Sequence, residues 1–398
     1  MQKNNNCSIC KKKFIKIIDL GLHPCADTFL NSKHNANLLP KLPLQVGYCS
    51  CFHFTAINKV SGYERYQKFK YSYTADNSPV SRNHFKTIAE KLAKKIRLNN
   101  KSFVVEAGSN DGTFLNAIKK FSKSKVLGVD PSKNVSKLAG KKGIKTITGF
   151  FNLKTAKFIT QKYSKTDLFF GANVFNHVDD LVNFLESVKK IIKPNGLIVI
   201  EVPDLESLIN KVGFDTIYHE HRNYFSENSL HKLFRKHKIK IIRIEKINYM
   251  SGSLRVYAQK SNKNIKNIKK RVISLKKIIQ FEKKMMLVKS KIIEFVYKMK
   301  KQNKIIAGVG AATKGNTLLN YCNLTSKHID FILDKSKLKI GKYTPGSCIK
   351  IVDEDRYKNF QALIILPWNI SKYLLKKFTK KTRKPYISVQ NIVKKLKK

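Results

Sequence analysis

The residues best suited to chemistry lie together in the segment 214–221, which reads Phe-Asp-Thr-Ile-Tyr-His-Glu-His. Its last four positions, Tyr218, His219, Glu220 and His221, carry a phenol, two imidazoles and a carboxylate. Such a cluster is typical of a site where protons are moved, because an imidazole titrates near neutral pH and its neighbours can orient it or relay the proton. Ligation of a metal by His219 and His221, or ordinary polarity within a core, is the alternative interpretation.

A ligand-binding turn is predicted at 104–115, where an apolar strand runs into a glycine-bearing turn and the start of a helix. Glu106 opens the turn, and Gly108 and Gly112 let the backbone come close to a ligand where a side chain could not. Asn110 stands between the two glycines, and we assign it to the same site. The dinucleotide fingerprint G-x-G-x-x-G is absent, which weakens a pyrophosphate-binding interpretation.

Two further strands end in polar residues. The strand 126–130 ends at Asp130, about 20 residues after the glycine turn, where a carboxylate can bind both hydroxyls of a ribose. Asn173 follows the apolar run that begins at Asp167. Together with the glycine turn, this pattern resembles the class I methyltransferases that use S-adenosylmethionine, and a domain that binds NAD is the alternative.

The cysteines predict a structural metal site. Cys7 and Cys10 form a C-x2-C knuckle, and Cys49 and Cys51 return about 40 residues later. Four thiolates from two tight turns can close a tetrahedral zinc shell. The C-x-C spacing of the second pair leaves His53 as an alternative fourth ligand.

The chain of 398 residues is long enough for several domains, and its pattern is that of an α/β protein. We expect a zinc-binding module at 1–80, a methyltransferase domain at 81–261, a helical linker at 262–301 and an α/β domain that binds substrate at 302–398. The linker is expected to bury apolar residues at three- and four-residue spacings. These are Ile268, Val272, Leu275, Ile279, Met285, Val288, Ile292 and Phe295.

Charge and hydropathy limit which kinds of binding partner the sequence predicts. The chain carries 80 basic and 26 acidic residues, a net charge of +54, but the lysines occur in almost every segment and no aromatic RNA-binding signature accompanies them. We therefore expect no nucleic-acid partner, and attraction of an anionic small substrate such as a diphosphate. Without a membrane span or a signal peptide in the sequence, we expect a cytoplasmic monomer or weak homo-oligomer that binds no membrane.

Six motifs in order extend the resemblance over nearly the whole chain. They lie at 20–24, 43–46, 214–221, 251–255, 308–317 and 342–346. With the cysteines, they resemble the sugar C-methyltransferases that alkylate nucleotide-linked 4-keto-deoxyhexoses. That family has a zinc-binding N-terminal domain, a Rossmann-like class I methyltransferase domain and a C-terminal domain of related fold. The chain departs from its pattern in the C-x-C spacing and at Thr55, where the family often has Gln.

The resemblance implies a reaction in which a base removes the proton beside a ketone and the enolate takes the methyl group, usually at C-3. His221 is the better candidate for the base, with Tyr218 and Tyr73 as the alternatives. Tyr218 could also donate to the enolate oxygen or relay the proton, and Glu220 could orient a ring or hold a sugar hydroxyl. By resemblance, His177 and Tyr73 also line the active site. Tyr71, two residues from Tyr73, is the competing match.

The C-terminal glycine turn at 308–315 precedes Asn316 and Thr317 and contains Lys314, so it could meet a nucleotide or phosphate at a helix start. Asp334 ends a later strand, which leaves a second cofactor domain as an alternative. By resemblance, the region contacts the sugar nucleotide. Two competing functions are an RNA methyltransferase and a sugar-nucleotide-binding protein without catalysis.

Overall fold

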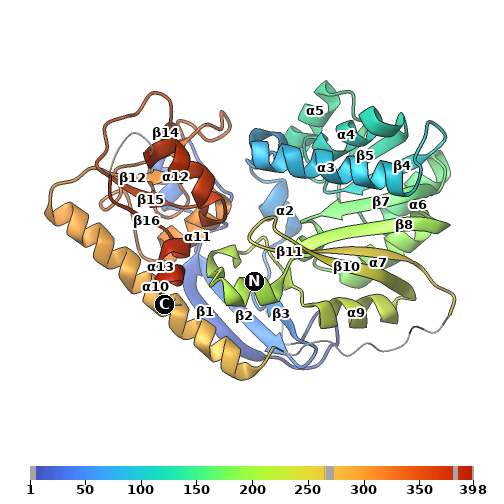
Figure 1. The fold of residues 1–398 in the computed structure, drawn as a ribbon, viewed down its shortest axis with the longest axis horizontal. Coiled ribbons are helices and arrows are strands. Elements are labelled where there is room, and N and C mark those ends of the chain that lie inside the picture. Colours follow the sequence, from blue (N-terminus) through green and yellow to red (C-terminus); the bar gives the residue numbers. More distant parts are fainter. Residues whose placement is uncertain (1–5, 264, 266–272, 380–383, 397–398) are drawn as a thin grey trace.

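The computed structural model describes residues 6–263, 265, 273–379 and 384–396, and its strands form three separate sheets. Figure 1 shows the largest sheet on one side of the molecule, a smaller parallel sheet on the other, and an antiparallel sheet between and below them. The predicted α/β class is confirmed.

The largest sheet has seven strands and carries the predicted cofactor turn. In the order in which they lie in the sheet, its strands are β10 (Ile239–Ile247), β11 (Ser253–Lys260), β8 (Ile192–Pro203), β7 (Thr166–Ala172), β4 (Phe103–Ala107), β5 (Lys125–Asp130) and β6 (Thr146–Thr148). The five strands from β8 to β6 are parallel, and β11 runs antiparallel to both of its neighbours. Because β4 pairs with β5 on one side and β7 on the other, a crevice opens beyond its carboxyl end, where α/β sheets bind ligands.

Helices cover both faces of this sheet, as Figure 1 shows. They are α3 (Pro79–Lys95), α4 (Thr113–Ser122) and α5 (Lys133–Lys141) on one face, and α6 (Leu153–Lys162), α7 (Leu181–Ile191) and α9 (Glu227–Lys236) on the other. The alternation of a strand directs Val104 into the core beneath α3 and α4, and Val105 into the core above α6 and α7. An apolar run such as 103–107 is therefore buried on both faces.

The N-terminal sheet is antiparallel and holds the segment that follows the predicted catalytic cluster. Its strands are β1 (Ile15–His23), β2 (Leu42–Cys49), β3 (His53–Ala56) and β9 (Asn223–Tyr224). The pairing of β3 with β9 places Phe54 opposite Tyr224, and the Ala56 N–H donates to the carbonyl oxygen of Arg222. The segment 214–221 is thereby fixed at its end to a sheet made of residues from the first sixth of the chain. Two short helices, α1 (Lys33–Asn37) and α2 (Gly62–Tyr66), complete the module.

The third sheet is parallel, and β12 at its centre leads to the second glycine turn. Its order is β14 (Ile351–Asp353), β13 (Phe331–Asp334), β12 (Ile306–Val309), β15 (Ala362–Ile365) and β16 (Tyr386–Ile387). The helices of this part are α11 (Thr313–Tyr321), α12 (Ser371–Thr379) and α13 (Val389–Lys395). As in the largest sheet, the central strand pairs with strands on both sides, so its carboxyl end also opens a crevice.

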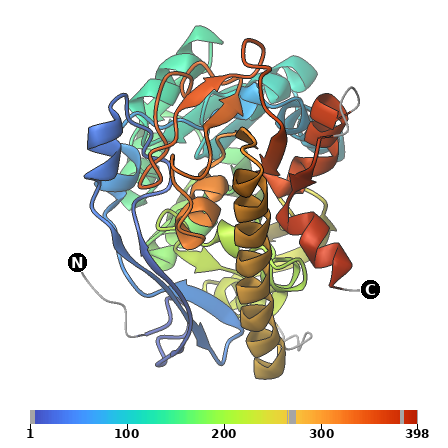
Figure 2. The same cartoon turned by 90° about the vertical axis from the view of Figure 1, so that its left-hand side faces the viewer.

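One helix of 27 residues, α10 (Leu275–Lys301), connects the largest sheet to the third sheet along the chain. Figure 2 shows it running along one face of the molecule. This helix shares a core with the N-terminal sheet and the third sheet. Its buried residues are Ile278, Phe281, Met285, Val288, Ile292, Val296 and Met299. No helix in the described part of the chain is both long and apolar enough to cross a membrane.

The expected apolar stripe of this linker was wrong in its first half. Leu275 and Ile279 are 50% and 54% exposed, while Ile278 faces the core, because the helical repeat that continues to Met285 passes through the neighbouring position. In the second half, Met285, Val288 and Ile292 are buried as expected, and Phe295 is partly buried against the same core. Ile268 and Val272 lie outside the described residues, and the bounds of the four predicted segments remain a prediction.

The core beneath α10 can be tested with two isoleucines of the same helix. We expect Ile292→Ala to lower the free energy of unfolding by about 2–4 kcal/mol, because it leaves a cavity in a closed core. Ile279→Ala is the matched control, with an expected change of about 0.5 kcal/mol or less. Urea denaturation measures both, and equal losses would contradict this placement of the helix.

Candidate active site

One cavity of about 530 Å³ lies where the three sheets meet. Ten of the eleven residues predicted for catalysis or cofactor binding line it: Tyr73, Glu106, Gly108, Asn110, Asp130, Asn173, His177, Tyr218, Glu220 and His221. The remaining one, Gly112, does not line the cavity. It begins α4 with a φ of +73°, and a Cβ there would lie 3.1 Å from Ile144, so this glycine serves the turn and its packing.

The glycine turn after β4 forms the floor of one end of the cavity. Gly108 has a φ of +64°, and a Cβ at this position would lie 2.9 Å from the Cβ of Val174. A larger residue is therefore excluded both by conformation and by space. The side chain of Asn110 ties the turn to the segment before α3, since its Oδ1 accepts from the Ala75 N–H at 3.1 Å and its Nδ2 donates to the Tyr73 carbonyl oxygen at 3.0 Å.

Two buried carboxyl groups stand beside this turn. Asp130 ends β5, and its two oxygens accept from the N–H groups of Asn110 and Ser132, each at 2.9 Å. Burial raises the pKa of Asp130 to about 6, against the pull of these two hydrogen bonds. Burial, and then the nearby acids Asp111 and Asp130, raise the pKa of Glu106 well above its usual value. Its Oε2 has no hydrogen-bond partner among the described residues.

Asn173 lies at the same end, after β7. Its φ of +53° is in the left-handed region, and its N–H donates to the carbonyl oxygen of Glu201 at 2.9 Å. The end of β7 is thereby held to the end of β8, and the left-handed turn directs the next residues across the cavity. The cofactor assignments of these residues remain predictions.

The aromatic and histidine rings of the predicted catalytic cluster meet at the other end of the cavity. The His221 ring centroid lies 4.0 Å from that of Tyr218 and 4.7 Å from that of His177. His221 Nδ1 is 2.7 Å from the carbonyl oxygen of Thr216. Because a carbonyl oxygen only accepts, Nδ1 carries the hydrogen and Nε2 keeps its lone pair.

Burial keeps both histidines of the cluster neutral. It lowers the pKa of His221 well below the usual value, with the His177 ring adding to the effect. It lowers the pKa of His177 to about 3, and the charge of Arg65 acts in the same direction. His177 Nδ1 lies 2.6 Å from the Tyr66 hydroxyl and 2.8 Å from the carbonyl oxygen of Glu220.

Glu220 presents a carboxyl group with one free oxygen. Its Oε1 accepts from the Asp27 N–H at 3.0 Å, while Oε2 is buried without a hydrogen-bond partner among the described residues. Burial, opposed by that hydrogen bond, raises the pKa of Glu220 to about 7. A group that titrates near neutral pH and has an unpaired oxygen is suited to exchange a proton or to bind a hydroxyl.

The structure separates the two competing tyrosines. Tyr73 lies toward the cofactor end, and burial raises the pKa of its phenol against hydrogen bonds with Ser81 and Tyr249. Tyr71 lies toward the catalytic end, where its ring centroid is 5.6 Å from that of Tyr66. After burial, the groups that raise its pKa include Asp27, Tyr66 and Tyr218. Tyr71, and not Tyr73, is therefore the neighbour of the 214–221 segment.

Sequence reasoning missed Asp27, which joins three parts of the chain at the cavity. Its Oδ1 accepts from the Ser72 hydroxyl at 2.7 Å and from the Thr313 hydroxyl at 2.9 Å, and its Oδ2 accepts from the Ser72 N–H at 2.9 Å. Its position three residues after Pro24 in a segment typical of a turn is a weak signal, because a lone aspartate there has many other uses. His219 is buried beside this site but does not line the cavity.

The four cysteines come together as a separate cluster. The Sγ atoms of Cys7, Cys10, Cys49 and Cys51 all lie within 4.8 Å of one another. Three of the separations are 2.7 Å for Cys49 and Cys51, 3.6 Å for Cys7 and Cys51, and 3.8 Å for Cys10 and Cys49. Four sulfurs at about 2.3 Å from one tetrahedral metal stand about 3.8 Å apart, a spacing that the last two pairs match and that Cys49 and Cys51 would reach by moving apart. Four converging thiols are the donor set of a structural zinc ion. His53 contacts the cluster, with its Nδ1 at 3.6 Å from Cys7 Sγ.

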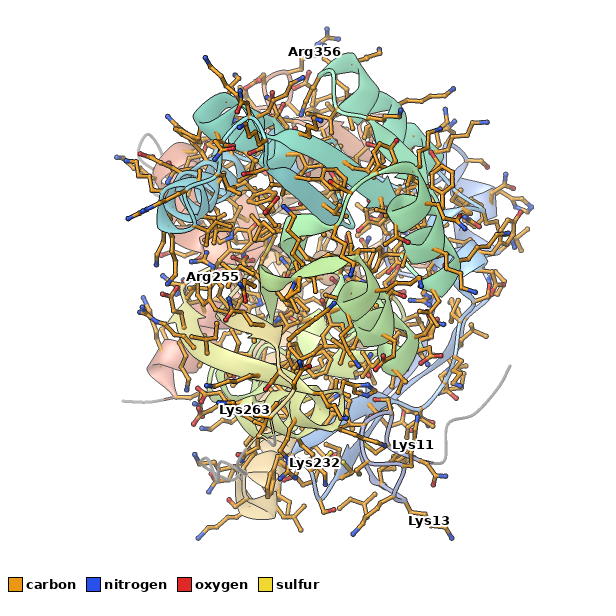
Figure 3. The ribbon with its side chains drawn as sticks, turned by 90° about the vertical axis from the view of Figure 1, so that its right-hand side faces the viewer. Lys11, Lys13, Lys232, Arg255, Lys263 and Arg356 are labelled. Carbon is orange, nitrogen blue, oxygen red and sulfur yellow. The ribbon has the colours of Figure 1, made fainter. Side chains whose placement is uncertain are left out.

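Basic side chains lie at both ends of the molecule. In Figure 3, Lys11, Lys13, Lys232 and Lys263 occupy the end that holds the cysteine knuckle and α9, and Arg356 lies at the opposite end. Among the residues that line the active-site cavity, Arg65 and Lys314 are the lysines and arginines. The high net charge is therefore a property of the whole surface and not of this cavity.

Most of the chain matches known protein families. Residues 81–243 match the family described as "Methyltransferase domain", and residues 249–386 match "C-methyltransferase C-terminal domain". The C-methyltransferase NovU of Streptomyces niveus is 27% identical over 380 residues, which are 92% of this chain and 90% of that protein.

Two solved structures match part of the chain. One is an S-adenosylmethionine-dependent methyltransferase from Clostridium acetobutylicum, with 12% identity and a TM-score of 0.36 over 46% of this chain and 92% of that one. The other is the magnesium protoporphyrin IX methyltransferase ChlM of Synechocystis PCC 6803 with bound S-adenosylmethionine. It has 13% identity and a TM-score of 0.35 over 45% of this chain and 79% of that one. The two domain matches, supported by the relative that spans both, show that the chain belongs to the S-adenosylmethionine-dependent C-methyltransferases.

Proposed function

We propose that this enzyme methylates a carbon beside the ketone of a nucleotide-linked 4-keto-deoxyhexose, at C-3. The observation that carries the proposal is the single cavity that joins the glycine turn and Asp130 at one end to His221, Tyr218 and Glu220 at the other. A saturated carbon is not a nucleophile until it loses a proton, so a C-methyltransferase needs a base within reach of the methyl donor. The six sequence motifs support the sugar nucleotide as substrate, and the net charge of +54 favours an anionic one.

At the cofactor end, Asp130 is suited to hold a ribose. Each of its oxygens accepts one backbone hydrogen bond and keeps a further acceptor site for a ribose hydroxyl. With a pKa of about 6, the group is ionised at neutral pH. S-adenosylmethionine, when bound, supplies an electrophilic methyl group. Because Gly108 has no side chain, S-adenosylmethionine can approach the backbone of the turn closely there. Glu106 offers a free carboxyl oxygen nearby.

At the catalytic end, we assign the base to His221. Its imidazole is neutral and its Nδ1 is held by Thr216, so Nε2 is the atom that takes the proton from carbon. Burial also raises the pKa of the Tyr218 phenol well above its usual value, so Tyr218 keeps its proton. A protonated phenol can donate a hydrogen bond to the ketone oxygen as charge develops on it. Glu220 binds a sugar hydroxyl or orients the sugar through its free oxygen.

We also propose a structural zinc ion held by Cys7, Cys10, Cys49 and Cys51. The four thiols converge from the knuckle at the chain start and from the turn between β2 and β3, and all four positions of a tetrahedral shell are filled by sulfur. A closed shell has no position for substrate, so the ion would hold the N-terminal sheet together and take no part in the reaction.

The zinc proposal predicts about one zinc ion per chain, measured by metal analysis of the purified protein. Cys49→Ser should lose most of this zinc and unfold at a lower temperature, because metal binding is coupled to folding. Cys25→Ser, in the same module but outside the cluster, is the control and should keep the metal. Zinc at the wild-type level in Cys49→Ser would exclude the site, and loss in His53→Ala but not in Cys51→Ser would make His53 the fourth ligand.

The base assignment is tested without methyl transfer. With S-adenosylhomocysteine present, wild-type enzyme should exchange the hydrogen at C-3 of a nucleotide-linked 4-keto-deoxyhexose for solvent deuterium, followed by NMR. His221→Asn should slow this exchange, and turnover, by about 10²- to 10⁴-fold, the usual share of a general base. Exchange that survives in His221→Asn but is lost in Glu220→Gln or Tyr218→Phe would move the base to that residue. No exchange by wild type with bound substrate would contradict enolate chemistry.

The raised pKa of Glu220 predicts a pH dependence of stability. The folded pKa of about 7 exceeds the ordinary value of 4.5, so the folded state holds this proton more tightly than the unfolded state does. The contribution of Glu220 to stability is therefore complete below about pH 4.5 and declines by about 3 kcal/mol as pH rises through 7. Glu220→Gln removes the titration, so its melting temperature should rise relative to wild type between pH 5 and pH 8. A difference that stays constant over this range would contradict the burial of an ionisable group here.

A further inference from the structure

We propose that Lys314 is a further catalytic residue, whose ammonium group stabilises the negative charge that develops on the substrate's ketone oxygen. This inference rests on the proposed function and adds to it a residue from the C-terminal part of the chain.

The fold brings Lys314 to the cavity from the third sheet. It is the second residue of α11, which begins just beyond the carboxyl end of the central strand β12. Thr313 and Lys314 are the residues of α11 that line the active-site cavity, and α11 packs beside residues 214–216. The hydroxyl of Thr313 is held by Asp27 at 2.9 Å, which fixes the start of the helix at the cavity wall.

Among the described residues, no carboxylate is in direct contact with Lys314. Its Nζ lies 3.3 Å from the hydroxyl oxygen of Ser251 and 5.2 Å from the centroid of the Trp368 ring. The acid that acts on it is Asp215, whose Oδ2 accepts from the Trp368 Nε1–H at 2.7 Å and whose Oδ1 is buried without a hydrogen-bond partner among the described residues. An ammonium group has three donors, so at least one of them remains for a substrate oxygen.

The other cation at the cavity is committed elsewhere. The Arg65 guanidinium donates to the carbonyl oxygens of Val60 and His177 and pairs with Asp179. The two histidines of the cavity are neutral, as shown above. Among the described residues that line the cavity, Lys314 is therefore the positive charge available to an anionic intermediate.

The charge of Lys314 also reaches the base. After burial and the His177 ring, Lys314 is among the groups that lower the pKa of His221. The other groups that face the His221 ring are the phenols of Tyr218 and Tyr224 and the carbonyl oxygen of Thr216, none of which is charged. Because His221 and Lys314 line the same cavity, a substrate whose carbon lies at His221 Nε2 can direct its adjoining ketone oxygen toward Lys314.

The step balances with this charge in place. His221 Nε2 takes the proton from the carbon, the electron pair of the broken C–H bond forms the C=C bond, and the carbonyl π pair moves to oxygen beside the Lys314 ammonium. When the methyl group arrives, the C=O bond re-forms, the new C–C bond is made, and the sulfur keeps the pair of the broken S–CH₃ bond. A preorganised donor to such an oxyanion is worth about 10²- to 10³-fold in rate.

The experiment compares Lys314→Met with wild type, Lys314→Arg as the conservative rescue, and Lys339→Met as the matched control. Lys339 is a buried lysine of the same part of the chain, whose Nζ donates to the Ala311 carbonyl oxygen at 2.7 Å, and it does not line the cavity. Circular dichroism and melting curves establish that each variant is folded. The rates measured are deuterium exchange at C-3 with S-adenosylhomocysteine bound, and kcat and KM for methyl transfer.

We expect Lys314→Met to lower both the exchange rate and kcat by about 10²- to 10³-fold with KM nearly unchanged, and Lys314→Arg to recover part of the loss. Lys339→Met should retain the wild-type rates. Because a neighbouring positive charge is removed, the pKa of His221 should rise, so the pH at which the exchange rate levels off should move upward in Lys314→Met.

Three results would overturn the inference. A higher KM with unchanged exchange and kcat would make Lys314 a binder of the substrate's diphosphate only. Wild-type exchange in Lys314→Met would remove its catalytic role while leaving the proposed function intact. An absence of exchange in wild type itself would reject the proposed function, and this inference with it.

Discussion

The Asp27 carboxylate is the contact on which the architecture of the active site depends. It accepts hydrogen bonds from Ser72, in the segment before α3, and from Thr313 at the start of α11. The backbone N–H of Asp27 donates to the Glu220 carboxyl group. Next to it, the Ala26 carbonyl oxygen accepts from Asn316 Nδ2 at 2.6 Å. Three sheets that have no strand in common are thus joined at one point of the N-terminal module. The cavity is lined by residues from all three parts of the chain that this connection holds together.

Burial of the ionisable groups around this cavity sets the protonation states that the chemistry needs. Burial holds His221 and His177 neutral and keeps the Tyr218 phenol protonated. It also brings the pKa of Glu220 to about 7. A neutral imidazole can accept a proton from carbon, and protonated phenols can donate to an oxyanion, so one physical cause prepares both halves of the reaction. In the proposed reaction, Lys314 adds a positive charge that, unlike that of Arg65, is available to a substrate oxygen.

Local patterns in the sequence were sufficient for the parts of the site that depend on a single strand end or turn. The glycine turn, Asp130 and the segment 214–221 fall into one cavity because parallel strands all end at one edge of a sheet. The choice between Tyr71 and Tyr73, the role of Asp27 and the first half of the α10 stripe could not be predicted this way. Each depends on which segment, distant in sequence, packs against the residue, and neither spacing nor composition records that. The packing role of Gly112 could not be predicted either, because the residue that leaves no room for a side chain there is Ile144, which is distant in sequence.

The central claim is that a carbon of the sugar receives the methyl group in this cavity. It is tested most directly by turnover of a nucleotide-linked 4-keto-deoxyhexose with S-adenosylmethionine labelled with ¹³C in its methyl group, followed by two-dimensional NMR of the product. The account predicts that the labelled methyl protons couple to C-3 and to both of its neighbours, the ketone carbon included. A labelled methyl group that couples to a single sugar carbon through oxygen, or a sugar that takes up no label, would contradict it.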